Sequence, residues 1–363
     1  MDSRREFLKN SAMVGAALSA SGTANLANAQ DSRVQLPTPR ALQLMSFFGL
    51  KYPIFQAPSN GAGPDLTASV SSAGAMGILR GTRLTPEDAR KAVTIVRART
   101  QRVFAVNYIL AFEPDSLPAV LEAGAPALHF SWGLPTKEMI SVMRSAGAKF
   151  GVQVASAIGA QSALDLGADY LVCQGIEAGG HVQSSTVLYE LLPKVLERAQ
   201  STPVLAAGGI GHGRKIREAL LAGASGAMLG TRFVANARES RAPRVQESPY
   251  QVHRERNDHV GMLSGRVAGR YASLAAQLDL SSAGRRLVCP PVGRRPGEGD
   301  VVAMRSDGST VLRYNAVPPV NDLRGAITDM ALYAGLGVGD VRDLPSAGEL
   351  VARLWIECLD QSR

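Results

Sequence analysis

Three apolar segments of this chain end in glycine-rich turns, and they follow one another at the spacing of repeated strand–helix units. The segments and the turns that follow them are 170–173 (YLVC) before 174–181 (QGIEAGGH), 203–207 (PVLAA) before Gly208-Gly209, and 226–229 (GAML) before Gly230-Thr231. Glycine lets the backbone turn sharply where a strand ends, and it lets a flat ligand approach closely. The pattern predicts buried strands whose carboxyl ends meet at one rim.

Short β-branched or aromatic runs alternate with helical, Ala- and Arg-rich segments from about residue 52 to 231. This alternation is typical of βαβ units and a parallel sheet, and eight strands in this rhythm predict an α/β fold, a (β/α)8 TIM barrel. We expect strands near 54–57, 76–79, 103–109, 127–131, 149–154, 170–174, 203–207 and 226–230. We expect helices near 65–73, 85–99, 115–123, 136–146, 158–166, 187–199 and 213–222.

The ends of the last two strands suggest a phosphate site. Gly208 and Gly209, followed by the start of a helix, offer backbone N–H groups and a helix dipole to a dianion. Gly230 and Thr231 repeat the arrangement after strand eight, where a TIM barrel typically binds phosphate. Gly208-Gly209 alone could equally be a tight turn, and the hypothesis rests on the two strand ends together.

His181 is the candidate catalytic residue. Its side chain titrates nearest neutral pH, which suits proton transfer, and it lies on the glycine loop after strand six. The alternative is a structural histidine that only shapes the loop. Glu177 is expected to brace this loop, and His129 on strand four is expected to be a core or loop-bracing residue.

These motifs together resemble the nitronate monooxygenase family, formerly called 2-nitropropane dioxygenases. The resemblance includes EAGGH at 177–181 and AAGGI at 206–210, and extends to 53–58 (PIFQAP), 73–77 (AGAMG), Val106-Asn107, 129–135 (HFSWGLP) and 331–335 (ALYAG). It implies an FMN-dependent barrel with the isoalloxazine across its mouth. The residues implied at the cofactor, besides the phosphate donors Gly208, Gly209, Gly230 and Thr231, are Ala57, Pro58, Asn107, Gln153, Gln174, Gly175 and Gly179.

The resemblance also implies the reaction: FMN-dependent oxidation of an alkyl nitronate, a small-molecule substrate, with O2 as the final oxidant. His181 would remove the proton next to a nitro group or position the nitronate. Flavin-dependent enoyl-acyl-carrier-protein reductases share much of this pattern. Two alternatives therefore stay open: an NAD(P)H-dependent FMN reductase of an enoyl or quinone-like substrate, and a flavin-binding protein without turnover.

Three positions depart from the family pattern. Ser59 stands where methionine is common, Gln153 stands where strand five commonly has a lysine near the flavin, and Leu336 follows Tyr333-Ala334-Gly335 where glutamine is usual. Losing the lysine removes a fixed cation and should disfavour the anionic reduced flavin. The flavin fold is thus better supported than nitronate as the substrate.

The first 29 residues read as a twin-arginine export signal. Arg4-Arg5 lies in the segment SRREFLK, a mildly apolar run spans 12–20, and Ala27-Asn28-Ala29 has the form of a cleavage site. The alternative is a basic N-terminal tail. The signal predicts a periplasmic protein, exported already folded.

The composition excludes several classes. The chain has 363 residues, 45% of them hydrophobic, and a net charge of +8. The arginines are dispersed without interleaved aromatics, so we expect no nucleic-acid partner. We expect no membrane anchoring and no metal ion, and a homodimer is possible. The three cysteines give no disulfide framework.

The strand–helix rhythm stops after Thr231. The predicted organisation is a signal peptide at 1–29, an FMN-binding barrel at 40–235, a cap or insert at 236–320, and C-terminal helices at 321–363 packed on the barrel. The insert is rich in Arg, Pro and Gly, so we expect mostly loop there, with a helix near 265–278. A last helix is expected at 346–359.

Overall fold

The computed structural model describes residues 35–59, 63–235, 296–315, 323–326, 329–330 and 333–361. The chain divides into two units, Met1–Leu36 and Pro37–Arg363, and the architecture below belongs to the second. The expected signal peptide at 1–29 and the expected helix near 265–278 lie outside the described residues.

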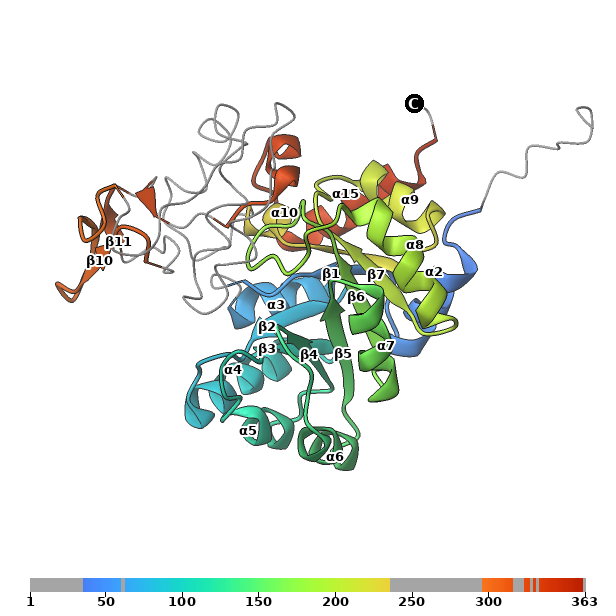
Figure 1. The fold of residues 1–363 in the computed structure, drawn as a ribbon, viewed down its shortest axis with the longest axis horizontal. Coiled ribbons are helices and arrows are strands. Elements are labelled where there is room, and N and C mark those ends of the chain that lie inside the picture. Colours follow the sequence, from blue (N-terminus) through green and yellow to red (C-terminus); the bar gives the residue numbers. More distant parts are fainter. Residues whose placement is uncertain are drawn as a thin grey trace, which may run out of the picture. The chain divides into compact units, whose positions relative to one another are not determined.

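Eight parallel strands form a TIM barrel (Figure 1). The strands are β1 Ile54–Gln56, β2 Gly77–Arg80, β3 Phe104–Ile109, β4 Ala127–Ser131, β5 Lys149–Val154, β6 Tyr170–Gln174, β7 Val204–Ala207 and β8 Gly226–Leu229. Each strand pairs with the next along the chain from β2 to β8, and β8 also pairs with β1. The predicted fold class is confirmed, and the strand bounds differ from those expected by at most one residue at either end.

The seam between β1 and β2 closes the barrel with few backbone contacts. Phe55 and Met76 form an isolated parallel bridge there. Next to it, the Gln56 side chain accepts a hydrogen bond from the Ile78 amide at 3.0 Å and donates one to the Ile78 carbonyl at 3.4 Å. Gln56 is fully buried, so its amide satisfies backbone groups that a regular strand pair would satisfy.

Seven helices connect these strands, and their ends follow the sequence signals. They are α3 Pro64–Ser72, α4 Pro86–Arg99, α5 Leu117–Glu122, α6 Lys137–Ser145, α7 Ala157–Asp165, α8 Leu188–Ala199 and α9 Gly213–Leu221. Thr85 caps α4 by accepting a hydrogen bond from the Asp88 amide at 3.1 Å. Gly147, just past the end of α6, has a φ of +68°, the left-handed conformation expected at a helix stop.

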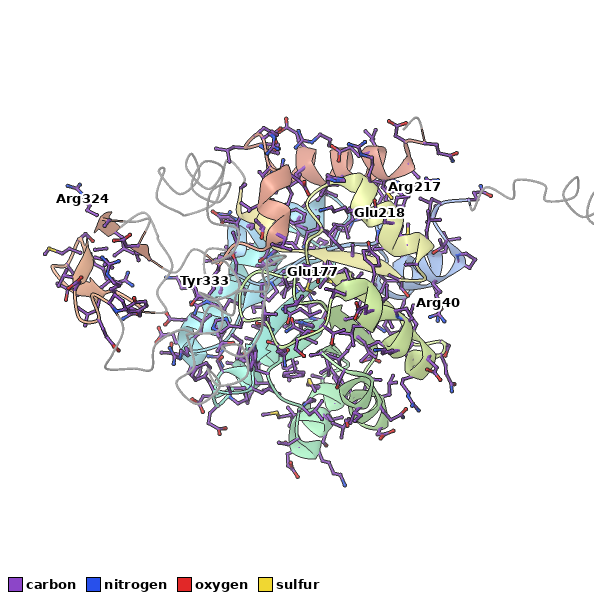
Figure 2. The ribbon with its side chains drawn as sticks, turned by 45° about the horizontal axis from the view of Figure 1, so that its top comes forward. Arg40, Glu177, Arg217, Glu218, Arg324 and Tyr333 are labelled. Carbon is purple, nitrogen blue, oxygen red and sulfur yellow. The ribbon has the colours of Figure 1, made fainter. Side chains whose placement is uncertain are left out.

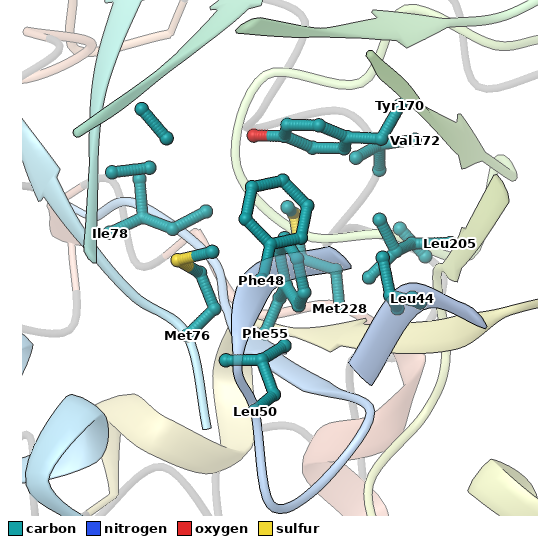
Figure 3. Close-up of a cluster of buried hydrophobic side chains, with 13 residues drawn as sticks. Leu44, Phe48, Leu50, Phe55, Met76, Ile78, Tyr170, Val172, Leu205 and Met228 are labelled. Atoms are coloured by element: carbon teal, nitrogen blue, oxygen red, sulfur yellow. The ribbon is translucent and has the colours of Figure 1, made fainter. Parts of the chain in front are cut away.

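A helix that the sequence analysis missed, α2 (Pro39–Phe48), closes the bottom of the barrel. Its Leu44 and Phe48 pack with Phe55, Met76 and Tyr170 in the buried cluster that Figure 3 shows. Tyr170 begins β6, so this cluster fills the end of the barrel where the strands start. The Phe48 and Tyr170 rings meet edge to face with centroids 5.5 Å apart. The opposite end, where the strands finish, is left for a ligand.

Tyr170 also explains a glycine inside a strand. A Cβ built on Gly151 of β5 would overlap the Tyr170 ring. The ring stacks on His129, with centroids 5.8 Å apart and planes inclined by 17°. The core role expected for His129 agrees with its 1% exposure.

The C-terminal region contains strands where loop and helix were expected. β9 Val301–Arg305 pairs antiparallel with β10 Thr310–Leu312 and with β11 Leu323–Gly325, and Val302, Val311 and Leu323 form a small core of their own. The last helix, α15 (Ala347–Leu359), lies where it was expected. It packs on α9, since Glu357 accepts a hydrogen bond from the Gly213 amide at 2.8 Å and Arg217 donates one to the Cys358 carbonyl at 3.3 Å.

Candidate functional site

A pocket opens at the carboxyl ends of the strands, where a TIM barrel places its active site. Eleven of the twelve residues expected at the site line it: Ala57, Pro58, Asn107, Gln153, Gln174, Gly179, His181, Gly208, Gly209, Gly230 and Thr231. The twelfth, Gly175, is not on the pocket wall. Its backbone packs against α8 instead, where an added Cβ would lie 2.6 Å from the Leu188 Cβ.

The loop after β7 presents backbone amides to the pocket. Gly208 and Gly209 have φ values of +125° and +67°, which favour glycine. Within the described ranges, no hydrogen bond is found from the amides of Gly208, Gly209 or Ile210 to another backbone group. Lys215, in the first turn of α9, donates to the Gly209 carbonyl at 3.0 Å and thereby holds the loop. Such an array of free amides beside a helix start suits an anion.

Gly230 and Thr231 lie after β8, at the start of the short helix α10 (Thr231–Val234). The Thr231 hydroxyl accepts a hydrogen bond from the Gly335 amide at 3.0 Å. A hydroxyl that accepts one bond can still donate its own proton. Thr231 can therefore serve both as a brace for the 333–335 segment and as a donor to a ligand oxygen.

Side chains at the ends of β6 and β4 hold the loop that carries His181. Gln174 accepts a hydrogen bond from the Gln183 amide at 2.8 Å, and its amide group donates to the His181 carbonyl at 3.4 Å. Trp132, after β4, donates to the same carbonyl at 3.3 Å. Glu177 accepts from the Leu188 amide through both carboxylate oxygens, at 3.1 and 3.0 Å, so it caps α8 and braces the loop.

A segment from near the end of the chain packs directly on this loop. The Gly180 amide donates to the Tyr333 carbonyl at 3.1 Å, and the Leu336 amide donates to the Glu177 carbonyl at 3.0 Å; Figure 2 labels Glu177 and Tyr333. A Cβ on Gly179 would lie 2.6 Å from the Gly335 amide nitrogen. Gly179 is thus required for the close approach of two backbone segments.

The His181 ring lies between two aromatic side chains. It stacks on Tyr333 at 5.4 Å and meets Trp132 edge to face at 6.4 Å. Burial, and secondarily the positive charge of Arg83, hold the pKa of His181 below its ordinary value. At neutral pH the ring is therefore uncharged and has a lone pair with which to accept a proton.

Asn107 and Gln153 occupy the floor of the pocket. The Asn107 side chain donates to the His129 carbonyl at 3.1 Å, and Gln153 donates to the side-chain oxygen of Gln183. His129 does not line the pocket, and burial lowers its pKa to about 3. It is therefore neutral in the fold and takes no part in the pocket's charge.

Among the pocket-wall residues that sequence reasoning missed are three large side chains, Arg80, Trp132 and Tyr333. Trp132 and Tyr333 have φ values of +58° and +52°, a conformation that costs energy for large side chains and often marks functional sites. Both belong to motifs that carry the family resemblance, which was a signal for them. Arg80 ends β2, and alternation along that strand from the buried Ile78 was the signal that it faces the barrel axis.

These residues fit a flavin mononucleotide. The amides at Gly208–Ile210 and the Thr231 hydroxyl suit its phosphate, while Asn107 offers a donor and an acceptor for the polar edge of a ring system. None of the described residues that line the pocket is an Asp or a Glu, which would repel a dianion.

In the part of the chain that the structure describes, no group of three or more His, Cys, Asp or Glu side chains is placed to hold a metal ion. Among the same residues, no helix combines the length and the apolar character needed to cross a bilayer.

Comparison with known proteins agrees with the fold. The nitronate monooxygenase family model matches residues 42–119 and 114–357. A Mycobacterium tuberculosis protein named (3aS,4S,5R,7aS)-5-hydroxy-7a-methyl-1-oxo-octahydro-1H-indene-4-carboxyl-CoA dehydrogenase is 28% identical, over 90% of this chain and 97% of that protein. A nitronate monooxygenase from Pseudomonas aeruginosa is 29% identical, over 82% of this chain and 94% of that protein.

Among solved structures, a nitroalkane oxidase from Streptomyces ansochromogenes is 25% identical with a TM-score of 0.63, covering 87% of this chain and 97% of that one. The family match spans most of the barrel and the C-terminal segment that packs on His181. The chain therefore belongs to the nitronate monooxygenase family, and it is a flavin-dependent oxidoreductase resembling those enzymes.

Proposed function

We propose that the protein binds FMN and oxidises alkyl nitronates with O2 as the electron acceptor. The observation that carries this proposal is that an uncharged histidine, His181, and the backbone amides at 208–210 line one pocket. The amides suit the phosphate of the cofactor, and the histidine suits a proton on the substrate. When bound, FMN supplies the electron-accepting chemistry of the reaction.

The chain's own residues bind and orient the reactants and control the proton. The amides of Gly208 and Gly209, with Gly230 and the Thr231 hydroxyl, hold the phosphate, and Asn107, Gln153 and Gln174 contact the ring system. Ala57, Pro58 and Gly179 shape the wall around it. Gly175 contributes indirectly, because its close packing on Leu188 fixes the loop that presents Gly179.

His181 acts on the substrate. As a free base it takes the proton from the carbon next to a nitro group, or it orients a nitronate that has already lost this proton. Trp132 and Tyr333 flank its ring, and their apolar faces limit access of water to the base. The backbone carbonyl of His181 is fixed by Trp132 and Gln174, so the ring is held in place before substrate arrives.

A second candidate is an NAD(P)H-dependent reductase of an enoyl or quinone-like acceptor. It is favoured by the 28% identical relative named as a carboxyl-CoA dehydrogenase, and by Gln153 at the position where the family commonly has lysine. In that reaction His181 would face a carbonyl oxygen instead of a carbon acid.

Anaerobic stopped-flow spectroscopy separates the two. The purified protein should be yellow, and the released cofactor should co-migrate with FMN. Ethyl nitronate should bleach the bound flavin much faster than NADH or NADPH does, and air should restore its colour. Rapid bleaching by a pyridine nucleotide with none by nitronate would establish the reductase instead. A colourless protein that takes up no added FMN would refute both.

A further inference from the structure

Arg80 is a half-buried cation on the pocket wall that the reaction above does not use. It ends β2 and stands in register with Asn107 of β3. With the described residues its guanidinium makes one hydrogen bond, from Nη1 to the Thr82 carbonyl at 3.2 Å. An arginine has five N–H donors in a planar fork, so most of this fork is left for a ligand.

No carboxylate of the described residues balances this charge. Arg80 forms no ion pair with any of them, and none of those that line the pocket is an Asp or a Glu. Glu177, a carboxylate on the loop that carries His181, is bonded to the Leu188 amide. The neighbouring Arg83 adds a second positive charge and lies over the Phe112 ring at 4.0 Å.

Burial without a counter-charge is costly for a guanidinium. Desolvation, and secondarily the charge of Arg83, hold the pKa of Arg80 below its ordinary value, although an arginine remains charged in such a site. Among the described residues, no ion pair with Arg80 offsets this desolvation. A negative charge on a ligand in the pocket would offset it.

The position of Arg80 indicates which part of the ligand carries the negative charge that it contacts. The phosphate donors lie at the ends of β7 and β8, whereas Arg80 lies at the end of β2 beside Asn107, which suits the polar edge of the ring system. We propose that Arg80 is the fixed cation that stabilises negative charge on the pyrimidine edge of the bound flavin. This inference rests on the proposed function, because it requires FMN in the pocket.

A cation at Arg80 replaces the lysine that the family commonly has on strand five. Gln153 there leaves the pocket end of that strand without a cation, which by itself would disfavour the anionic reduced flavin. Arg80 supplies the charge from β2 instead. The reduction potential of the bound FMN should therefore lie above that of free FMN.

Sulfite binding to the oxidised holoenzyme tests this directly. The sulfur lone pair forms a bond to N5 of the ring, the displaced electron pair is held at the N1–C2=O edge, and no group leaves. A cation at that edge strengthens binding, which is read from loss of the visible flavin absorbance. The variants are Arg80→Met, which removes the charge, and Arg80→Lys, which keeps it. Arg83→Gln is the matched control that removes a nearby charge outside the pocket wall.

Arg80→Met should raise the dissociation constant of sulfite about tenfold or more, whereas Arg80→Lys should keep it within about threefold. Arg83→Gln should change this constant little, because a charge-assisted hydrogen bond requires contact with the flavin. Each titration uses protein saturated with FMN, because removal of a cation beside the ring system can also weaken flavin binding. Unchanged sulfite affinity in Arg80→Met would overturn the proposal.

The parent protein gives an independent result if Arg80→Met does not fold. A holoenzyme that binds no sulfite and whose FMN has a potential at or below that of free FMN contradicts the proposal. A parent protein without flavin contradicts the proposed function instead, so the two failures are distinguishable.

Discussion

The ring of His181 stacks on the ring of Tyr333, with centroids 5.4 Å apart and planes inclined by 23°. The two residues are far apart in the sequence, and the contact depends on backbone hydrogen bonds between the 177–180 loop and the 333–336 segment. A segment near the end of the chain thus completes the wall around the histidine. The stacking buries the imidazole, and burial favours its uncharged form.

The first prediction concerns the substrate that needs this base. His181→Asn should lower kcat/KM for a neutral nitroalkane by about 10²–10⁴-fold, the usual cost of losing a general base. Turnover of the preformed nitronate should fall far less, because that substrate has already lost its proton. Steady-state oxygen consumption with both forms measures the difference. An equal, small loss with both would mean that His181 only shapes the pocket.

The same histidine predicts the pH profile for the neutral nitroalkane. The pKa of His181 lies below its ordinary value, so the base is already free at neutral pH. Since protonation removes the lone pair, kcat/KM should fall only when the pH drops below the ordinary histidine pKa of about 6.5. The acidic limb should be absent in His181→Asn. A limb centred above that value would contradict the assignment.

The second prediction tests the phosphate site. Gly230 has a φ of −102°, and a Cβ there would lie 3.5 Å from the Ala57 Cβ, an ordinary contact. Gly230→Val should therefore fold, while its side chain enters the space proposed for the phosphate and reduces FMN content at least about tenfold. Gly348→Val is the matched control, because a Cβ at Gly348 meets nothing within 4 Å. Full flavin occupancy in Gly230→Val would refute the phosphate assignment.

The sequence predicted the barrel well because its signals are local. Alternating apolar runs, first-turn prolines and glycine stops each act within a few residues, as Thr85 and Gly147 illustrate. α2 was missed although Thr38-Pro39 is a helix start, because it precedes the first strand and lies outside the strand–helix alternation. The strands β9 to β11 were missed because a region rich in Arg, Pro and Gly has no clear alternation.

Candidate site residues that lie in a sequence motif were predicted, whereas residues that only the fold brings to the pocket were missed. The glycine turns indicated Gly208, Gly209, Gly230 and His181 directly. Arg80 lies at the end of an ordinary strand. Alternation from Ile78 indicates that it faces the barrel axis, and the pairing of β2 with β3 places it beside Asn107 at the pocket. Gly175 illustrates the opposite case, since a glycine in the motif serves packing on Leu188 instead of the ligand.

We also propose that the N-terminal 29 residues direct export of the folded protein by the twin-arginine route, with the mature protein in the periplasm. Arg4→Lys together with Arg5→Lys should retain the protein in the cytoplasm, because the arginine pair is read by a receptor. Arg33→Lys, beyond the expected cleavage site, is the matched control. Cell fractionation followed by immunoblotting measures the outcome. Equal periplasmic yield from the double variant and the control would exclude this route.

The last prediction concerns His129 and acid stability. Burial lowers the pKa of His129 to about 3 in the fold, whereas an unfolded histidine has a pKa of about 6.5. Between these values the unfolded chain binds a proton that the folded chain does not, so stability falls as the pH drops through this window. This residue alone should lower the free energy of unfolding by roughly 2 kcal/mol between about pH 7 and pH 5.

His129→Gln removes the titration and should show a correspondingly shallower loss on acidification. The comparison uses denaturant unfolding of both proteins at the two pH values, each saturated with FMN. The variant should be less stable at neutral pH, since the contacts of the ring with Tyr170 are lost. The informative quantity is therefore the change with pH and not the stability itself. If the free energy of unfolding fell equally with pH in the two proteins, His129 would be protonated in the fold as readily as in the unfolded chain.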